Sequence, residues 1–224
     1  MTLRRRFLIP ALVACAYAGA LYAQADQALY VVRYVEAVPA SQGQVATMLK
    51  QLAEGSRTEK PVQFEVLQST TVANQFLVLE VWKDQAALDA HNGAAPARQF
   101  RERVAPLLRA PLDDRLCVTT IGAPPRAGSG GIYVVTHVDV APPTRDAAVT
   151  VLQAIAEQSR KDPGNVGYDI VHQKDRTNHF TTIGVWTDQK ADDSHQLAPH
   201  TMAYRTKIAP MLGALYDQRW YRPL

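Results

Sequence analysis

An internal duplication constrains the fold of this 224-residue chain more than any other feature. The segment VWKDQAALDAH at 81–91 returns as VWTDQKADDSH at 185–195, and LYVVRYVEAVP at 29–39 returns as IYVVTHVDVAP at 132–142. The offset between the copies is 103 residues at their start and 104 after one added residue. Repetition on this scale is typical of two copies of one structural unit. The sequence therefore predicts two units of similar fold.

A stretch rich in proline and glycine separates the two copies. Its sequence, GAPPRAGSGG at 122–131, has no apolar periodicity and is typical of a linker. We therefore place the first repeat at residues 26–121 and the second at residues 132–224.

The first half of each copy is predicted to contain the same secondary-structure elements. A β-branched strand with alternating polarity opens it, at 30–36 and at 133–139. A helix follows, and in the first copy Ser41 and Gln44 form an expected capping box at its start. The apolar face of this helix has the same spacing in both copies: Val45, Met48, Leu49 and Leu52, then Ala148, Val151, Leu152 and Ile155.

The second half of each copy begins with a predicted hairpin, whose strands cover 63–68 and 75–82, then 167–172 and 179–186. Asp84 and Asp188 are expected to cap a short helix. An amphipathic helix and a final strand complete the copy, with that strand near 115–121 in the first repeat and 216–221 in the second.

This order of strand, helix, two strands, helix and strand predicts an α+β fold of two ferredoxin-like repeats. The helices of one copy leave one face of its sheet uncovered. Pairing the two sheets face to face would bury both uncovered faces. We therefore expect an intramolecular version of a dimeric α+β barrel, present as a monomeric pseudo-dimer or as a homo-oligomer.

Residues 1–25 have the features of an export signal. Three arginines at 4–6 precede an apolar run that ends in AQA at 23–25, so the mature chain is expected to begin at Asp26. The run is too short to predict a membrane span, and no stable insertion is expected after cleavage. RRRFL resembles a twin-arginine signal, and the alternative is lipoprotein cleavage before Cys15. We expect a periplasmic or secreted protein.

The charge of the expected mature chain excludes a nucleic-acid groove. The whole chain has 24 basic and 21 acidic residues, and the leader removes three arginines and no acid. A formally neutral protein lacks the surplus of cations that binding to a phosphate backbone requires. Cys117 is the single cysteine left after cleavage and is expected to be a buried apolar residue.

Several segments resemble the antibiotic biosynthesis monooxygenase family. They are SRTEKPVQFEVLQ, LEVWKDQAALDAH and FRERVAPLL in the first copy, and SRKDPGNVGYDIVHQ and VWTDQKADDSHQLAPH in the second. The resemblance implies a dimeric α+β barrel and a small oxygenase without metal or flavin. The implied partners are dioxygen and a small aromatic molecule, such as a phenol, a quinol or a polycyclic aromatic. We accordingly expect no cofactor.

Neither copy keeps the whole family pattern. The glutamate two residues before the tryptophan is Glu80 in the first copy, while Gly184 stands there in the second. The second histidine, five residues after the first, is His200 in the second copy, while the first has Pro96. Either one site has decayed or the two have specialised.

Aromatic residues and histidines are the candidate site residues. Trp82 and Trp186 are core anchors or walls on which a planar substrate stacks, with Phe76 and Phe180 on the same side of their strands. The candidate catalytic residues have alternative roles as ordinary structural groups, and they are His195, Tyr168, His200 and His91. An imidazole can act as a base or hydrogen-bond partner for a phenol because it titrates near neutral pH.

Further candidates occupy matching strand positions. Tyr34 and His137 are placed either in a substrate pocket or in ordinary sheet packing. His195 and His200 are five residues apart, which on one helix turns their side chains away from each other, so no metal site is expected. The second copy is the better candidate site because it alone combines Tyr168 with His200.

The resulting hypothesis is an exported monooxygenase that needs no cofactor and acts on a phenolic, quinol or polycyclic aromatic substrate. In such a reaction the substrate is its own reductant, and the protein contributes orientation, a hydrogen bond and exclusion of water. The alternative is a non-catalytic periplasmic binder of small aromatic or lipophilic molecules. A titratable side chain beside the tryptophan favours catalysis, and a pocket without one favours binding.

Overall fold

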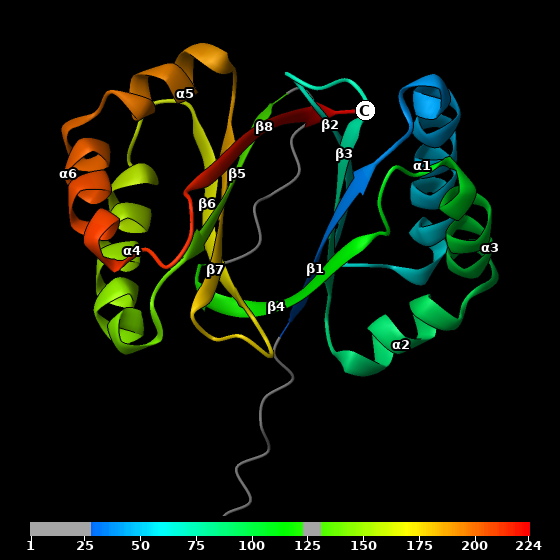
Figure 1. Cartoon of the computed structure of the whole chain (residues 1–224), viewed down its shortest axis with the longest axis horizontal. Helices are drawn as coiled ribbons and strands as arrows, with labels where there is room; N and C mark the ends of the chain where they lie inside the picture. The colour runs from blue at the N-terminus through cyan, green and yellow to red at the C-terminus, as the bar shows by residue number, and fades with distance from the viewer. Residues whose placement is uncertain (1–27, 123–130) are drawn as a thin grey trace, which may run out of the picture.

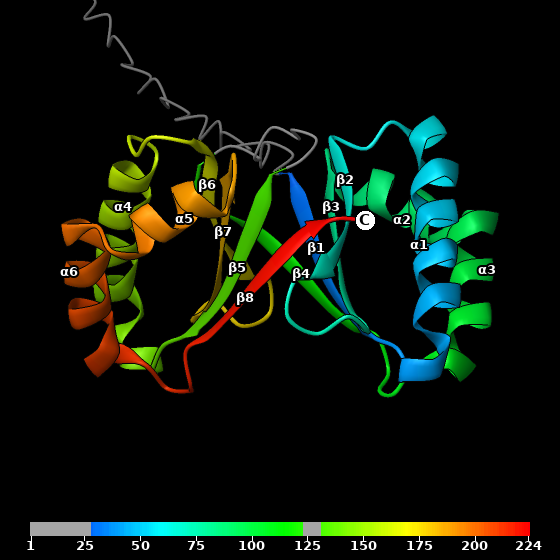
Figure 2. The ribbon, with the colours of Figure 1, turned by 90° about the horizontal axis from the view of Figure 1, so that it is seen from above.

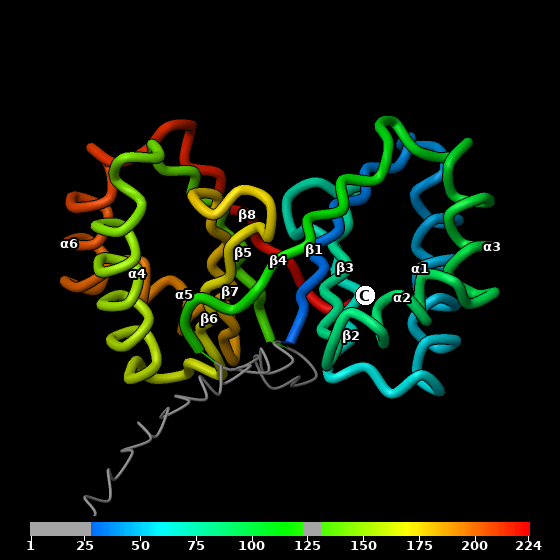
Figure 3. The backbone as a smooth tube through the Cα atoms, turned by 90° about the horizontal axis from the view of Figure 1, so that it is seen from below, coloured from blue at the N-terminus to red at the C-terminus, as the bar shows by residue number. Residues whose placement is uncertain are grey.

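The computed structural model of the chain describes residues 28–122 and 131–224. The expected leader lies outside these residues, as does the linker apart from its two terminal glycines. Strands from both repeats lie between two helix layers, with α1, α2 and α3 on one side and α4, α5 and α6 on the other (Figure 1). The views from above and below show the same arrangement (Figures 2 and 3).

The two repeats contain the same elements in the same order. The first consists of β1 (Leu29–Glu36), α1 (Gln42–Ser56), β2 (Gln63–Ser69), β3 (Gln75–Trp82), α2 (Gln85–Gly93), α3 (Ala95–Val104) and β4 (Asp113–Ile121). The second consists of β5 (Ile132–Asp139), α4 (Arg145–Ser159), β6 (Asn165–Gln173), β7 (His179–Trp186), α5 (Gln189–Gln196), α6 (Pro199–Ile208) and β8 (Asp217–Pro223). The expected pair of α+β repeats is confirmed.

The strands close into one barrel in the order β1-β3-β2-β8-β5-β7-β6-β4. The last strand of each repeat joins the two halves, because β4 pairs with β1 and with β6, and β8 pairs with β5 and with β2. All of these pairs are antiparallel. The expected pairing of the two sheets is therefore confirmed, and it is made through hydrogen-bonded strands as well as through packed faces.

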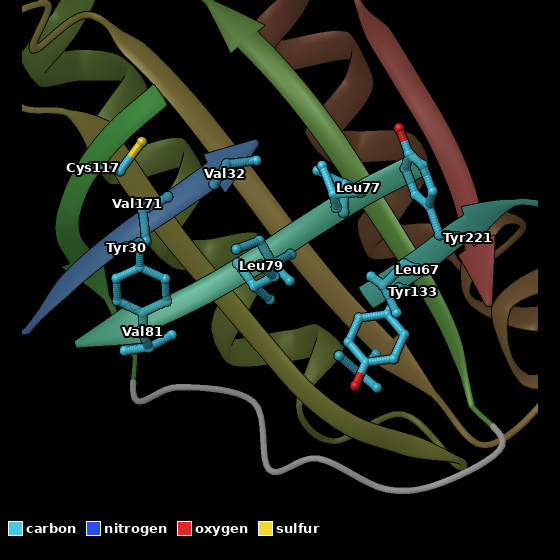
Figure 4. Close-up of a cluster of buried hydrophobic side chains, with 13 residues drawn as sticks. Tyr30, Val32, Leu67, Leu77, Leu79, Val81, Cys117, Tyr133, Val171 and Tyr221 are labelled. Atoms are coloured by element: carbon cyan, nitrogen blue, oxygen red, sulfur yellow. The ribbon is translucent and has the colours of Figure 1, made fainter. Parts of the chain in front are cut away.

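The barrel interior is filled by side chains from both repeats. Strand residues alternate between the two faces of the sheet, so Tyr30 and Val32 point inward while Val31 and Val35 face the helices. Figure 4 shows residues of this cluster from both repeats, with Tyr30, Leu79 and Val81 from the first and Tyr133 and Tyr221 from the second. Cys117 belongs to it and is fully buried, as expected, and burial raises the pKa of its thiol to about 12.

Each helix layer encloses a second apolar core against the outer face of its own strands. In the first repeat this core includes Leu49, Phe76 and Phe100, and in the second it includes Leu152, Phe180 and Tyr204. Because one face of the strands meets the barrel interior and the other meets the helices, β3 is buried along nearly its whole length.

Local signals of the sequence are mostly confirmed. The Asp84 carboxylate accepts a hydrogen bond from the Ala87 amide, and the Asp188 carboxylate accepts one from the Ala191 amide. The expected capping box at Ser41 is wrong: its side chain makes no capping hydrogen bond, because a 3₁₀ turn at Pro39–Ser41 already leads into α1.

The residue added to the second copy is accommodated by a β-bulge between Asn165 and Gly167. From Gly167 onward the register is the same in both repeats, because Gly167 pairs with Val185 of β7 as Gln63 pairs with Val81 of β3. Among the described residues, no helix is both long enough and apolar enough to cross a membrane.

Candidate active site

The tryptophan and the histidine of the repeated motif stack on each other in both repeats. The ring centroids of Trp186 and His195 lie 4.5 Å apart with an angle of 29° between planes, and those of Trp82 and His91 lie 4.6 Å apart at 28°. Both tryptophans are fully buried at the ends of β7 and β3. The structure thus brings the predicted pair together, with the tryptophan as the buried surface that supports the imidazole.

A carboxylate holds each of these histidines. His195 Nδ1 lies 2.8 Å from Asp162 Oδ2, and His91 Nδ1 lies 2.8 Å from Glu59 Oε2. Both acids follow the first helix of their repeat, and they are separated by the same 103 residues as the copies themselves. Asp162 and Glu59 are not among the residues predicted from the sequence, although an acid recurs at this position in both copies.

His200 lies beside His195 because the chain breaks between α5 and α6. The ring centroids of the two histidines are 5.6 Å apart, and His200 Nε2 lies 3.0 Å from Asp162 Oδ2. The prediction that His195 and His200 point away from each other is wrong, because they do not lie on one continuous helix. In the structure α5 ends at Gln196 and α6 begins at Pro199, which redirects the chain.

Tyr168, on β6, also packs near His195. Its ring centroid lies 5.9 Å from that of His195, and its hydroxyl interacts with Thr182 and Ser159. Burial raises the pKa of Tyr168, with Tyr216 adding to the effect, so the phenol stays protonated at neutral pH. Phe180 is buried in the same apolar layer, and Phe76 occupies the matching place in the first repeat.

His195 reaches a cavity at the surface of the second repeat. The cavity has a volume of about 450 Å³ and is lined by Asp162, Gly164, Thr187, Lys190, Ser194 and His195 among others. Burial lowers the pKa of His195, and the hydrogen bond to Asp162 acts in the opposite direction. The net direction favours a neutral imidazole at neutral pH. Donation of Nδ1–H to Asp162 would leave the Nε2 lone pair for an incoming proton.

The matching place in the first repeat has different chemistry. Glu80 accepts a hydrogen bond of 3.0 Å from Trp82 Nε1, and its second oxygen accepts one of 2.8 Å from Arg33. His91 Nε2 lies 3.7 Å from Glu80 Oε2. The first repeat therefore contains a buried, charged network that encloses its histidine.

The second repeat has Gly184 in place of that glutamate. A Cβ at this position would lie 3.1 Å from the indole nitrogen of Trp186 and 3.3 Å from the ring of Tyr168. The tyrosine ring thus packs where a side chain would otherwise begin. The two repeats have become different sites on one scaffold.

Tyr34 and His137 do not share this cavity. His137 lies on the face of β5 that carries Tyr133 and Val135 into the barrel, and Tyr34 packs against the same interior cluster. Trp186 faces the helix layer instead. Tyr34 and His137 therefore do not line one pocket with the tryptophans, because the sheet separates the two groups.

Tyr34 and His137 lie instead at a polar end of the barrel. The Tyr34 ring contacts two guanidinium groups, with Arg115 at 4.6 Å and Arg219 at 5.3 Å from the ring centroid. His137 lines a larger cavity of about 930 Å³ together with Arg115, Asp139 and His179. We call this end of the barrel, defined by Tyr34, His137, Asp139, His179 and Arg115, the barrel mouth.

Two groups of side chains among the described residues have the composition and spacing to hold a metal ion. One is Asp162 with His195 and His200 at the candidate active site, and the other is His137 with Asp139 and His179 at the barrel mouth. In each group the ligand atoms all lie within 4.8 Å of one another.

Comparison with known proteins assigns both repeats to the same kind of domain. The family model described as antibiotic biosynthesis monooxygenase matches residues 28–103 and again residues 131–207. The Bacillus subtilis (strain 168) protein named "Putative monooxygenase YcnE" is 32% identical over 81 residues, which cover 36% of this chain and 85% of that protein. That relative therefore corresponds to a single repeat.

Solved structures resemble the whole two-repeat arrangement. A Fusobacterium nucleatum protein described as a putative monooxygenase superposes with a TM-score of 0.76 at 14% identity, over 89% of this chain and 93% of that chain. An anthrone oxidase-like protein superposes with a TM-score of 0.67 at 14% identity, over 89% and 92%. At this level of identity the similarity shows the fold alone.

Proposed function

Because the chain belongs to the antibiotic biosynthesis monooxygenase family, we propose that its second repeat oxidises a phenolic, quinol or polycyclic aromatic substrate without a bound cofactor. Family membership and the relative named as a monooxygenase support oxygenase activity in general. The site is inferred from the geometry of the second repeat, and the substrate class is inferred from the resemblance to the family.

The pair formed by Asp162 and His195 carries the proposal. A carboxylate that accepts the Nδ1 hydrogen fixes the orientation and tautomer of the imidazole and leaves Nε2 to act as a base. His195 lines the cavity of about 450 Å³, which lies within the size range of small-molecule sites, about 300–1,000 Å³. A base at the wall of such a cavity favours catalysis over simple binding.

The proposed reaction needs only the substrate and dioxygen. His195 removes the phenolic proton, and the electron-rich phenolate transfers one electron to O₂. The resulting phenoxyl radical and superoxide combine at a ring C–H carbon to form a C–O bond. Protonation and cleavage of the O–O bond, with loss of the ring hydrogen, give a quinone and one molecule of water. One oxygen atom thus enters the product, and the substrate supplies the electrons.

The residues around His195 are suited to particular steps. The imidazolium formed by proton uptake is stabilised by Asp162, which lies 2.8 Å from its Nδ1. His200 contacts the same carboxylate oxygen at 3.0 Å and can assist in returning a proton. Trp186 and Tyr168 support the imidazole from the buried side, where the apolar layer excludes water.

We also propose export, on the basis of the leader at residues 1–25. Its arginines, its apolar run and its small-x-small site at 23–25 support this. N-terminal mass determination of the protein recovered from the periplasm should give Asp26 as the first residue. A lipidated Cys15 would overturn the proposed cleavage site.

Oxygen uptake with a series of naphthols and hydroxyanthrones tests the activity. We expect His195→Ala to lower the rate about ten- to a thousandfold, the range of a single acid–base or charge-stabilising group. His91→Ala is the matched control, because it removes the same residue of the same motif from the other repeat. Uncatalysed oxidation is subtracted with heat-denatured protein.

The two variants distinguish a catalytic role of the repeated motif from a purely structural one. A large loss with His195→Ala and a small one with His91→Ala, at similar melting temperatures, supports the proposal. Equal and small losses of rate with equal losses of melting temperature would show that the motif only supports the fold.

A further inference from the structure

We propose that His137, Asp139 and His179 form a binding site for one divalent transition-metal ion at the barrel mouth. This site is separate from the candidate active site, since it lies on the opposite face of the sheet from Trp186 and His195. It departs from the expectation, drawn from the sequence, that the chain has no metal site.

Strand pairing brings the three side chains to one place. His137 and Asp139 are two residues apart on β5, so both project from the same face of the strand. His179 is the direct partner of Asp139 in the antiparallel pair of β5 and β7. Directly paired residues lie about 4.5–5.5 Å apart at Cβ, and hydrogen-bonded strands hold this spacing. The ligands are thus positioned by rigid backbone.

The ligand atoms converge on one point. His137 Nε2 and His179 Nδ1 each lie 2.8 Å from Asp139 Oδ1. Metal–ligand bonds of about 2.0–2.2 Å place adjacent ligand atoms roughly 3 Å apart around an octahedral ion and about 3.3–3.6 Å apart around a tetrahedral ion such as zinc. The observed spacing therefore suits a shared ion with little movement of the side chains.

Hydrogen bonding does not account for this convergence. Although two imidazole nitrogens lie within range, Asp139 Oδ1 finds no partner with hydrogen-bond geometry among the described residues. A buried carboxylate oxygen left in this state costs free energy. A cation bound by His137, Asp139 and His179 together would offset this free-energy cost.

The site is sheltered and still open to solution. The side chains of His137, Asp139 and His179 are 14%, 16% and 22% exposed, and all three line the cavity of about 930 Å³. Three protein ligands leave coordination positions free toward that cavity. Two imidazoles with one carboxylate suit zinc, cobalt, nickel or iron(II) better than calcium or magnesium.

The charges around the site are compatible with a cation. Burial lowers the pKa of His137, with Arg115 acting in the same direction and Asp139 against it, so a neutral imidazole is favoured. Metal binding requires that form. The positive charge of Arg115 is offset by Asp113, which accepts hydrogen bonds from its guanidinium at 2.8 and 3.1 Å.

The first repeat provides an internal control. Tyr34, Glu36 and Gln75 occupy the positions that correspond to His137, Asp139 and His179. The same backbone therefore exists in this protein with residues that do not make a histidine site. His179→Gln copies the first repeat at one ligand and is expected to fold.

Equilibrium dialysis of the full chain against Zn²⁺, without a histidine tag and with metal analysis of the retained protein, tests the site. We expect one saturable ion per chain, and we expect His179→Gln, His137→Ala and Asp139→Asn each to weaken binding at least about a hundredfold. His200→Ala is the matched control, because it removes one ligand from the other metal-compatible group. Circular dichroism of the apo variants checks that each is folded.

Cobalt(II) gives a second measurement. Its visible spectrum should change on binding to the wild type and to His200→Ala, and it should remain that of the free ion with His179→Gln. Absence of saturable Zn²⁺ binding would overturn the proposal. So would binding that survives both His179→Gln and His137→Ala, or binding that is lost in His200→Ala and kept in His179→Gln, since the ion would then lie at Asp162. None of these results depends on oxygenase activity.

Discussion

Arg33 Nη1 donates a 2.8 Å hydrogen bond to Glu80 Oε1 at a place where the second repeat has Thr136 and Gly184. Both members of the pair are buried, and Asp114 accepts a further hydrogen bond from Arg33 at 3.2 Å. Replacement of both residues in the second copy removes the whole network at once. This suggests that the two residues depend on each other.

A double-mutant cycle tests that dependence. Arg33→Thr leaves the Glu80 carboxylate buried without its cation, so we expect the free energy of unfolding to fall by about 3–5 kcal/mol. Arg33→Thr combined with Glu80→Gly should lose less than the sum of the two single changes, because the isolated charge is gone. Urea denaturation measures all three variants.

The control for that cycle is Arg57→Ala. Arg57 pairs with Glu54 on the surface at 3.1 Å, with both side chains mostly exposed, and such pairs contribute about 0–1 kcal/mol. Strict additivity in the buried cycle would contradict the proposed dependence.

The acid limb of the pH–rate profile, where the oxygenase rate falls as the pH falls, should follow the protonation of His195. The base is active when neutral, so the rate rises as the pH rises through its pKa. Burial places that pKa below its ordinary value, and Asp162 opposes the effect. Asp162→Asn removes the opposing carboxylate, so the limb should move to still lower pH while the maximal rate falls. If the acid limb of Asp162→Asn lies at the same pH as that of the wild type, His195 is not the base of the reaction.

Lys60 in the first repeat has a left-handed backbone conformation, so a glycine at this position should stabilise the protein. Lys60 has φ of 55°, and Gly164 occupies the matching turn of the second repeat with φ of 81°. Lys60→Gly should raise the free energy of unfolding by about 0.5–1 kcal/mol, because relief of about 1–2 kcal/mol of strain exceeds the added entropy of the unfolded chain. Thermal or urea denaturation measures the difference.

Gly164→Ala is the converse variant. Its Cβ would lie 2.5 Å from the Ala191 Cβ and 2.8 Å from Thr187 Oγ1, in a backbone conformation that already disfavours side chains. We expect a loss of about 1–3 kcal/mol. Tolerance of alanine at this position would contradict the geometry of the turn.

Asp169 should make stability fall as the pH rises through the weakly acidic range. Burial raises its pKa from 3.8 to about 7, with Arg160 acting against the shift. The folded state thus holds a proton between about pH 4 and 7 that the unfolded state has lost. The stability tied to this proton is complete below pH 4 and is lost as the pH rises to about 7.

Asp169→Asn removes this contribution. The stability of the variant relative to the wild type should increase across that window, with a slope of at most about 1.4 kcal/mol per pH unit. Parallel stability curves for the two proteins would show that Asp169 is already ionised in the folded state.

The sequence predicts the parts of this fold that depend on local spacing. The duplication identifies both repeats, and the acids after each tryptophan cap their helices as expected at Asp84 and Asp188. The capping box at Ser41 is wrong because the proline before it permits a 3₁₀ entry into α1, an outcome that the spacing alone does not distinguish.

The parts that the sequence does not predict depend on contacts between distant segments. Whether Tyr34 and His137 face the tryptophans or the barrel depends on the register between β strands and on which face the helices cover. Asp162 reaches His195 across 33 residues of chain. His200 reaches it only because two helices meet at an angle there.

The presence of both repeats in one chain also removes a constraint that a homodimer would impose. In a symmetric pair each substitution occurs twice, so a ligand near the axis meets two identical walls and has two equivalent orientations. In this chain the barrel mouth has His137 and His179 from the second repeat, while the corresponding positions of the first repeat hold Tyr34 and Gln75. A molecule without symmetry of its own can therefore be held there in a single orientation.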